Sequence, residues 1–325
     1  MSSVLKSIRD VLVSSERILI LSHVRPDGDA IGSQVGLALA LLALHKEIAA
    51  WNQDGCPANL RFLAGSERVV TPPAAPESFD TVVCLDTASR ERLGTSLAGV
   101  ASARCWINVD HHGSNPGYGD INLVEAQAAA TGEVVYELLT GYGLPFPLES
   151  AAALYVAIST DTGSFRYPNT TPRTLQTAAD LLKRGIDGAA ICGQIYESYP
   201  RRRAVLLGEL LARARFEADD RVAAFLLDGQ TKGRLGIHPE DLDGLIDAIR
   251  CIDSVVVAAF FEELPNGRVR VSLRSKSPEV NVDQLCREYG GGGHRAAAGA
   301  RIRGGLQQVA DIVLERVARE ISQRH

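Results

Sequence analysis

Histidine and aspartate occur together in a short segment near the N-terminus that could bind a metal ion. Residues 23–33 read HVRPDGDAIGS and contain one imidazole, His23, and two carboxylates, Asp27 and Asp29. The proline and the glycines of this segment impose a tight backbone path, which lets the three side chains converge. Imidazole and carboxylate ligands suit Mn²⁺ or Mg²⁺, and no thiolate is present to favour zinc. Taken alone, the segment is explained equally well as a polar turn with a helix cap.

Three later segments repeat the same combination of an apolar run and a following acid or imidazole. They are Asp86 after TVVCL, Asp110-His111-His112 after CWINV, and Asp161 after ALYVAIST. A single aspartate after a strand is usually a turn or cap residue. Four such places that use only histidine and aspartate favour a shared site, because parallel strands bring their carboxyl ends to one edge of a sheet. We therefore expect side chains from four strand ends to meet at one metal-binding site, although the run before Asp161 also fits a helix.

A second group of residues with chemical potential lies near the C-terminus. Residues 290–294 read GGGGH, and successive glycines let backbone N–H groups approach an anion closely. Arg274 adds a forked donor set that suits phosphate. Most glycine runs are flexible loops, so the run is weak evidence by itself. The predicted phosphate-binding group consists of Arg274, Ser275, Gly291, Gly292, Gly293 and His294.

The elements that must position the first group follow an alternating pattern up to about residue 190. Continuous apolar strands separated by helices are typical of a parallel sheet covered on both faces. Thr171-Pro172 opens one of the helices with a cap and an N-terminal proline. The strand candidates are 17–23, 46–52, 79–86 and 105–112, and the helix candidates are 1–17, 33–46, 131–143, 148–160 and the segment from 172.

The remainder of the chain predicts a smaller mixed unit. Strands fit at 221–227, 255–264 and 268–275, and Asn266-Gly267 favours a tight hairpin between the last two. Helices fit at 239–252, 281–290 and 306–322. The predicted fold class is α/β, with an N-terminal parallel-sheet domain, a smaller C-terminal mixed α/β domain and an active-site cleft between them. The predicted boundaries are 1–190 for the first domain, 191–215 for a helical linker and 216–325 for the second domain.

Composition excludes several classes of protein. The 325 residues are 46% hydrophobic and 22% charged, which is typical of a folded, soluble, two-domain chain. The net charge of -5 argues against a protein that coats long nucleic acid. The longest apolar run is too short to cross a bilayer, so we expect no membrane association. Residues 201–203, three consecutive arginines, fit a charged helix face better than a nucleic-acid contact.

The cysteines favour a reducing compartment. All six are scattered, with no Cys-x-x-Cys pair, and this spacing argues against a disulfide framework or a zinc site. We expect reduced, buried thiols in a cytoplasmic protein. The six are Cys56, Cys84, Cys105, Cys192, Cys251 and Cys286.

The motifs resemble those of a known family. HVRPDGDAIGS, LDTAS, VDHHGSN and STDTGSF are similar, in this order, to the four motifs of the DHH phosphoesterases. VSLRSK and GGGGHRAAAG resemble the glycine-rich motif of the associated DHHA1 domain. The two domains account for nearly the whole chain. The subgroup that it resembles most is the bifunctional nanoRNase (oligoribonuclease) and pAp phosphatase type.

The resemblance implies a role for each matching residue. It implies that His112 binds a phosphate oxygen or protonates the leaving group, and that Asp110 orients a histidine. Two Mn²⁺ or Mg²⁺ ions that share Asp86 would activate a water for attack on phosphorus. The implied ligands are His23, Asp27 and Asp86 for one ion, and Asp29, Asp86, His111 and Asp161 for the other.

The resemblance also implies the class of substrate. We expect hydrolysis of short single-stranded oligoribonucleotides, of 3'-phosphoadenosine 5'-phosphate, or of both, and no binding of long duplex nucleic acid. Linear or cyclic dinucleotides are alternative substrates, and a catalytically inactive nucleotide-binding regulator is the alternative of another class. Family members are often homodimers. The sequence leaves open the cleavage polarity and the choice between manganese and magnesium.

Overall fold

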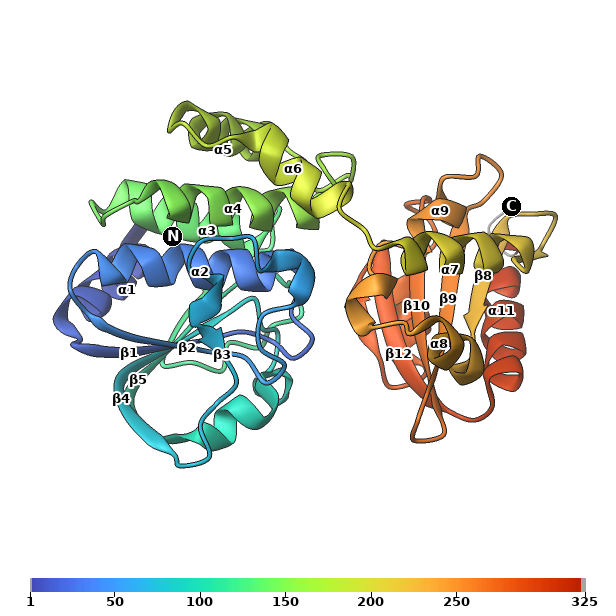
Figure 1. The fold of residues 1–325 in the computed structure, drawn as a ribbon, viewed down its shortest axis with the longest axis horizontal. Helices are drawn as coiled ribbons and strands as arrows, with labels where there is room; N and C mark the ends of the chain where they lie inside the picture. The colour runs from blue at the N-terminus through green and yellow to red at the C-terminus, as the bar shows by residue number, and fades with distance from the viewer. Residues whose placement is uncertain (1, 323–325) are drawn as a thin grey trace. The chain divides into compact units, whose positions relative to one another are not determined.

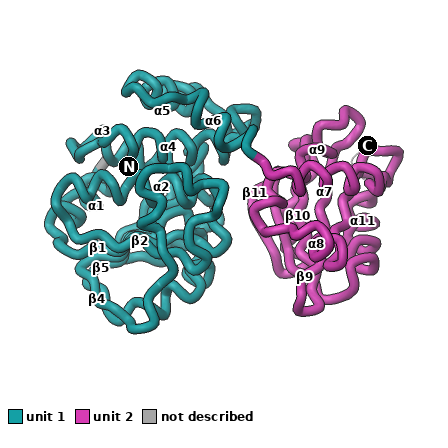
Figure 2. Tube along the Cα trace, in the orientation of Figure 1, with its two compact units in different colours: residues 1–198 teal, residues 199–325 magenta. Residues whose placement is uncertain are grey.

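The chain forms two compact units, Met1–Ser198 and Tyr199–His325, in a computed structural model that describes residues 2–322 (Figure 2). Each unit has its own sheet and its own apolar core. The predicted fold class is confirmed, because the first sheet is wholly parallel and the second is mixed.

The sheet of the first unit places the strand ends of interest next to one another. Its strand order is β3-β2-β1-β4-β5-β6, so β1, β4 and β5 are neighbours at the centre (Figure 1). Toward their carboxyl ends these strands are mostly apolar and buried, as parallel strands covered on both faces must be. The strands are β1 (Arg17–Leu21), β2 (Glu47–Trp51), β3 (Val69–Val70), β4 (Glu77–Leu85), β5 (Val100–Asp110) and β6 (Ile121–Val124).

The helices of the first unit cover one face of this sheet. Ile18 and Ile20 of β1 pack in the same apolar cluster as α1 to α4, whereas Leu19 and Leu21 belong to a cluster on the opposite face. That opposite face meets Leu93 of a 3-10 segment, so a short irregular element stands where the alternating pattern predicts α-helices. The elements are α1 (Ser2–Ser14), α2 (Gly28–Leu42), η1 (Ala58–Leu60), η2 (Ser66–Arg68), η3 (Arg90–Gly99), α3 (Thr131–Gly141), α4 (Leu148–Asp161), α5 (Pro172–Lys183) and α6 (Gly188–Tyr196).

The second unit is a six-stranded mixed sheet with helices on both faces. Its strand order is β11-β12-β10-β9-β8-β7, and only the β8–β9 pair is parallel among the described strands. One face packs on α10 and α11 and the other on α7 and α9. The elements are α7 (Arg201–Ala212), β7 (Arg215–Glu217), β8 (Val222–Leu227), α8 (Gly229–Leu235), η4 (Pro239–Leu242), α9 (Asp247–Arg250), β9 (Val257–Leu264), β10 (Arg268–Ser275), α10 (Val282–Arg287), β11 (Gly292–His294), β12 (Ala297–Arg303) and α11 (Leu306–Ser322).

Two predicted elements differ from the structure. The single helix expected over 239–252 is divided into η4 and α9, because Gly244 between them has a φ of 69° that no right-handed helix accommodates. The helix α7, placed in a linker by the sequence, packs into the second unit through Leu206 and Leu210.

The arginine run at the start of α7 is a structural feature of the second unit. Arg202 Nε lies 2.6 Å from Asp241 Oδ2, and Arg203 donates to the carbonyl of Asp241 at 2.7 Å. Arg203 also stacks on the ring of Tyr199, with its guanidinium carbon 3.8 Å from the ring centroid. These contacts attach α7 to η4, so two of the three arginines are used within the fold.

The cysteines are free, and the expectation that all are buried is wrong. Cys56, Cys84 and Cys286 are buried, but Cys251 is exposed. Among the helices of residues 2–322, none combines the length and the apolar character that a bilayer crossing requires.

Candidate active site

The predicted metal ligands come from the ends of three strands, the end of one helix and the start of another. His23 follows β1, Asp86 follows β4 directly, and His111 comes directly after β5. Asp27 caps α2, and Asp29 lies in its first turn. Asp161 is the last residue of α4, so the expectation of four strand ends is wrong at this position. The apolar run before Asp161 belongs to a helix buried on most of its surface, and periodicity alone does not separate such a run from a buried strand.

The two carboxylate oxygens of Asp27, in the loop after β1, have different contacts. Oδ1 accepts from the backbone N–H groups of Asp29 (3.1 Å) and Ala30 (3.0 Å) and so caps α2. Oδ2 lies 3.8 Å from His23 Nε2. A side chain at Gly28 would overlap Thr160 of α4, so only glycine permits this close approach of loop and helix.

Asp86 lies between the two groups of ligands. Its Oδ2 is 3.3 Å from His23 Nε2, and its Oδ1 is 3.6 Å from His111 Nε2. Its backbone has a φ of 53°, in the left-handed region that side chains rarely adopt. Strained residues of this kind persist where the surrounding structure fixes them, and they cluster at functional sites. The carboxylate therefore has one oxygen directed to each group, the geometry of a bridging ligand.

The second group forms around His111. Its Nε2 lies 3.7 Å from Asp29 Oδ2 and 3.6 Å from Asp161 Oδ2. Asp29 is buried and is fixed by the first N–H groups of α3, with Thr131 N donating to Oδ2 (2.7 Å) and Gly132 N donating to Oδ1 (2.9 Å). A helix N-terminus stabilises an anion in this way.

The charges of the site call for cations. Burial and the neighbouring carboxylate of Asp86 raise the pKa of Asp29 well above its ordinary value. Burial would lower the pKa of His23, but the carboxylates of Asp27 and Asp86 outweigh it and raise that pKa to about 10. A proton on His23 thus offsets part of the negative charge that a divalent cation would neutralise. The donors are imidazole nitrogens and carboxylate oxygens only, which fits Mn²⁺ or Mg²⁺.

The ligand atoms also lie close enough to share ions. Within residues 2–322, the atoms of each of two groups lie within 4.8 Å of one another: His23, Asp27 and Asp86, and Asp29, His111 and Asp161. All six residues predicted as ligands from the sequence are therefore brought together in the first unit.

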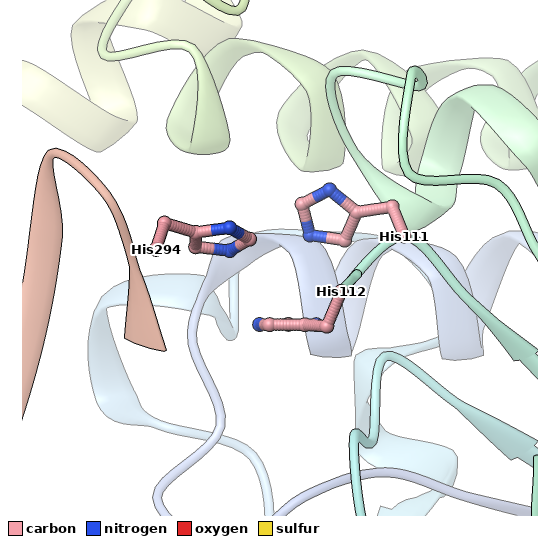
Figure 3. A group of neighbouring side chains, drawn as sticks. All are labelled: His111, His112 and His294. Carbon is pink, nitrogen blue, oxygen red and sulfur yellow. The ribbon is translucent and has the colours of Figure 1, made fainter. Parts of the chain in front are cut away.

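His112 is oriented by Asp110. Its Nδ1 lies 2.8 Å from Asp110 Oδ1, and the same oxygen accepts from the backbone N–H of His111 (2.8 Å). The ring centroids of the two histidines are 4.7 Å apart, and the rings are inclined at 64°. Figure 3 shows the two rings beside one another. Burial would lower the pKa of His112, but the hydrogen bond to Asp110 and the nearby carboxylates raise it to about 9. His112 thus has one nitrogen committed to a buried acid, as a positioned proton donor requires.

The support for Asp110 was not anticipated from the sequence. Asn115 Nδ2 donates to Asp110 Oδ2 at 2.7 Å and to Asn108 Oδ1 at 2.8 Å. Asn115 is the last residue of the VDHHGSN segment, so its presence in that segment was an available signal. Thr131 and Gly132, which fix Asp29, stand at the start of a predicted helix, and a helix N-terminus is a known anion site.

In the second unit the strand register brings Arg274 and His294 to the same level of the sheet. Arg274 of β10 and His294 of β11 both pair with Ala297 of β12, one from each side. Directly paired residues share a face of the sheet, so both side chains belong to one face. Ser275 instead is 6% exposed and donates to the carbonyl of Ser277 at 3.0 Å. The structure therefore associates Arg274 with His294 but not with Ser275.

The glycines of residues 290–293 allow close packing against β12 and do not leave their backbone amides free. Gly290 N donates to Arg287 O (3.0 Å) and Gly291 N to Cys286 O (2.9 Å). Gly293 N donates to Asp283 Oδ1 at 2.8 Å. These three amides therefore donate within the fold and are not directed to a bound phosphate. A side chain at Gly291 would overlap the carbonyl of β12, and Gly293 has a φ of 155°, which explains the glycines.

Comparison with known proteins identifies relatives over nearly the full length. The chain is 36% identical over 320 residues to the bifunctional oligoribonuclease and PAP phosphatase NrnA of Thermus thermophilus, covering 98% of this chain and 94% of that protein. It is 31% identical over 290 residues to NrnA of Bacillus subtilis, covering 88% and 90%. The cyclic-di-AMP phosphodiesterase GdpP of Geobacillus thermodenitrificans is 26% identical over 313 residues, but the match covers 46% of that protein.

Solved structures share the fold. An exopolyphosphatase-related protein from Bacteroides fragilis superposes with a TM-score of 0.88 at 26% identity, over 98% of this chain and 96% of that one. RecJ of Thermus thermophilus, solved in complex with Mn²⁺, has a TM-score of 0.55 at 17% identity, over 98% of this chain and 55% of that one, which shows the fold alone. The N-terminal domain of the DHH family matches residues 17–158, and the DHHA1 domain matches residues 219–323. With these matches and the ligand groups around Asp86, the chain belongs to the DHH family.

Proposed function

We propose that this protein is a dinuclear-metal phosphoesterase that hydrolyses short oligoribonucleotides and 3'-phosphoadenosine 5'-phosphate. The observation that carries the proposal is the position of Asp86, whose two oxygens lie 3.3 Å from His23 and 3.6 Å from His111. The names of the relatives that match nearly the full chain supply the substrate class.

The ligand roles follow from the two groups. His23, Asp27 and Asp86 would hold one Mn²⁺ or Mg²⁺ ion, and Asp29, Asp86, His111 and Asp161 the other. Bound there, such ions would supply Lewis-acid activation of a water and stabilisation of charge on a phosphoryl group.

The chain's own residues perform the remaining steps. Asp110 holds His112 through Nδ1, so Nε2 is the atom that we assign to the phosphate or to the leaving oxygen. A pKa raised to about 9 keeps a proton on His112 at neutral pH, as a general acid requires. Asp110 stays ionised, because its hydrogen bonds from His112 and Asn115 outweigh burial and lower its pKa to about 2.

We assign substrate-binding residues to the second unit as well. Arg274 and His294 lie on one face of neighbouring strands, and a guanidinium binds a phosphate through two parallel hydrogen bonds. Gly291 and Gly293 would let β11 lie close against β12, and Ser275 would support the end of β10.

The test is hydrolysis of defined substrates by the purified protein. Ribonucleotides of two to five residues and 3'-phosphoadenosine 5'-phosphate should be cleaved in the presence of Mn²⁺, and a long structured RNA should be cleaved more slowly. Asp86→Asn should abolish turnover of both, whereas Asp10→Asn, at an exposed surface acid, should not change it. Hydrolysis by Asp86→Asn at the wild-type rate would refute the bridging role.

A cyclic or linear dinucleotide is the alternative substrate. The match to GdpP supports it less, because that match spans under half of GdpP whereas NrnA is matched over 94% of its length. Including cyclic di-AMP and its linear product in the assay distinguishes the two. An inactive nucleotide-binding regulator would bind these substrates and cleave none of them.

A further inference from the structure

The turn that leads from β6 into α3 contacts several of the predicted metal ligands. We call residues 128–132 the α3 entry turn. It donates two backbone N–H groups to Asp29. Thr131 Oγ1 donates to Asp86 Oδ1 at 3.2 Å, and the carbonyl of the first residue of the turn lies 3.4 Å from His111 Nδ1. A shift of this turn would therefore move three ligands together.

One side of the α3 entry turn is fixed by a fully buried carboxylate. Glu133 has no exposed surface, and its Oε2 accepts from Ala129 N (2.9 Å) and from Thr174 Oγ1 (3.3 Å). Its Oε1 lies 3.0 Å from Arg173 Nε, and Arg173 also lies 2.7 Å from Glu137. A buried charge needs a partner of opposite sign, and Arg173 at the start of α5 supplies this partner to the Glu133 side chain.

The other side of the turn is fixed by a single amide. Asn169 Nδ2 donates to the carbonyl of Ala129 at 3.0 Å and to the carbonyl of Asp161 at 3.1 Å. One side chain therefore ties the α3 entry turn to the backbone of the remaining ligand of the second group. Asn169 and Arg173 are four residues apart and both lie where the chain enters α5.

We propose that the Glu133–Arg173 pair and Asn169 are positioning residues that set the affinity of the second ligand group, Asp29, His111 and Asp161, for its cation. This inference rests on the proposed function, because it requires the site to bind metal. Residues that orient metal ligands typically change metal affinity or activity by about 10- to 100-fold when they are replaced. Asn169 and Arg173 lie at the start of α5. Apart from Asp161, every predicted ligand is more than ten residues away from them in the sequence.

The test compares Mn²⁺ binding in three variants. Arg173→Met removes the partner of Glu133, and Asn169→Ala removes the amide. Tyr136→Phe is the matched control, because the Tyr136 hydroxyl also joins α3 to α5, through Asp180 at 3.1 Å, without touching the α3 entry turn. Titration calorimetry gives the two Mn²⁺ affinities, and steady-state kinetics gives kcat and KM at saturating Mn²⁺.

Arg173→Met and Asn169→Ala should each weaken one of the two Mn²⁺ affinities about 10- to 100-fold. The second Mn²⁺ affinity and the KM for substrate should stay within twofold of the wild-type values. Tyr136→Phe should leave both affinities within twofold. Equal affinities in the wild type and in Asn169→Ala, or an equal loss in Tyr136→Phe, would overturn the inference. Asn169→Ala alone decides it if Arg173→Met does not fold. Wild-type protein that binds no Mn²⁺ would overturn the proposed function itself.

Discussion

Mn²⁺ binding should release protons at neutral pH, because the metal-free site holds a proton on His23. The carboxylates of Asp27 and Asp86 outweigh burial and raise the pKa of His23 to about 10. At pH 7 this imidazole is therefore almost fully protonated, and a metal ligand must be neutral. One pH unit corresponds to about 1.36 kcal/mol, so the proton penalty at pH 7 is about 4 kcal/mol. The apparent Mn²⁺ affinity should rise about tenfold per pH unit, or about 100-fold between pH 6.5 and pH 8.5.

Calorimetry in buffers of different ionisation enthalpy measures this release directly. The slope of observed enthalpy against buffer ionisation enthalpy gives the number of protons, and we expect at least about one per protein at pH 7. His112→Asn is the control, because it removes the other histidine with a raised pKa and leaves every predicted ligand in place. A slope of zero, with an affinity that is constant between pH 6.5 and pH 8.5, would refute the electrostatic description of the site.

Three further predictions follow from the same geometry. Asp110→Asn should lower kcat about 10- to 100-fold with little change in KM, because His112 loses the charge that holds its orientation and proton; an unchanged kcat and pH profile would contradict the role. Gly28→Ala should destabilise the protein by about 1–3 kcal/mol in chemical denaturation, because the new methyl group overlaps Thr160. The matched variant Gly208→Ala adds a methyl group on an exposed face of α7, where it meets nothing within 4 Å. Gly208→Ala should therefore stabilise the protein by about 0.5–1 kcal/mol. A loss of stability in both variants would point to a general cost of alanine and not to the overlap. The metal-free protein should lose stability as the pH rises from about 6.5 through about 10, since a raised histidine pKa contributes fully below the unfolded value and is lost above the folded one; denaturation midpoints that rise over this range in EDTA would be inconsistent with it.

The sequence indicates the candidate site residues because their chemistry is expressed locally. Asp86 and Asp110 end apolar strands, and parallel strands bring such residues to one edge of a sheet whatever the intervening chain does. The bridging position of Asp86 came from the family resemblance, and the structure gives it a physical basis in two carboxylate oxygens that face different imidazoles.

The supporting residues could not be predicted in the same way. Asn169 acts through contacts with carbonyl groups 8 and 40 residues away in the chain, and no local pattern encodes such distances. Asp161 was counted among the strand ends although the run before it was also a helix candidate, because periodicity alone does not separate a buried helix from a buried strand. Such errors arise where tertiary packing decides the outcome.

The glycine run shows the same limit in the second unit. Its composition suggested free amides, but carbonyl groups of α10 and the carboxylate of Asp283 accept hydrogen bonds from three of them. Arg274 and His294 flank Ala297 because β12 lies between β10 and β11 in a specific register. No local sequence pattern predicts that order of strands. Predictions that depend on strand pairing were therefore less reliable than those that depend on strand ends.

The most direct test of the central claim is the anomalous diffraction of a crystal grown with Mn²⁺. Data collected at the manganese edge should show two peaks about 3.5 to 4 Å apart, with one oxygen of Asp86 directed to each. His23 and Asp27 should contact one peak, and the group around His111 the other. A single peak, or two peaks that Asp86 does not bridge, would contradict the dinuclear site.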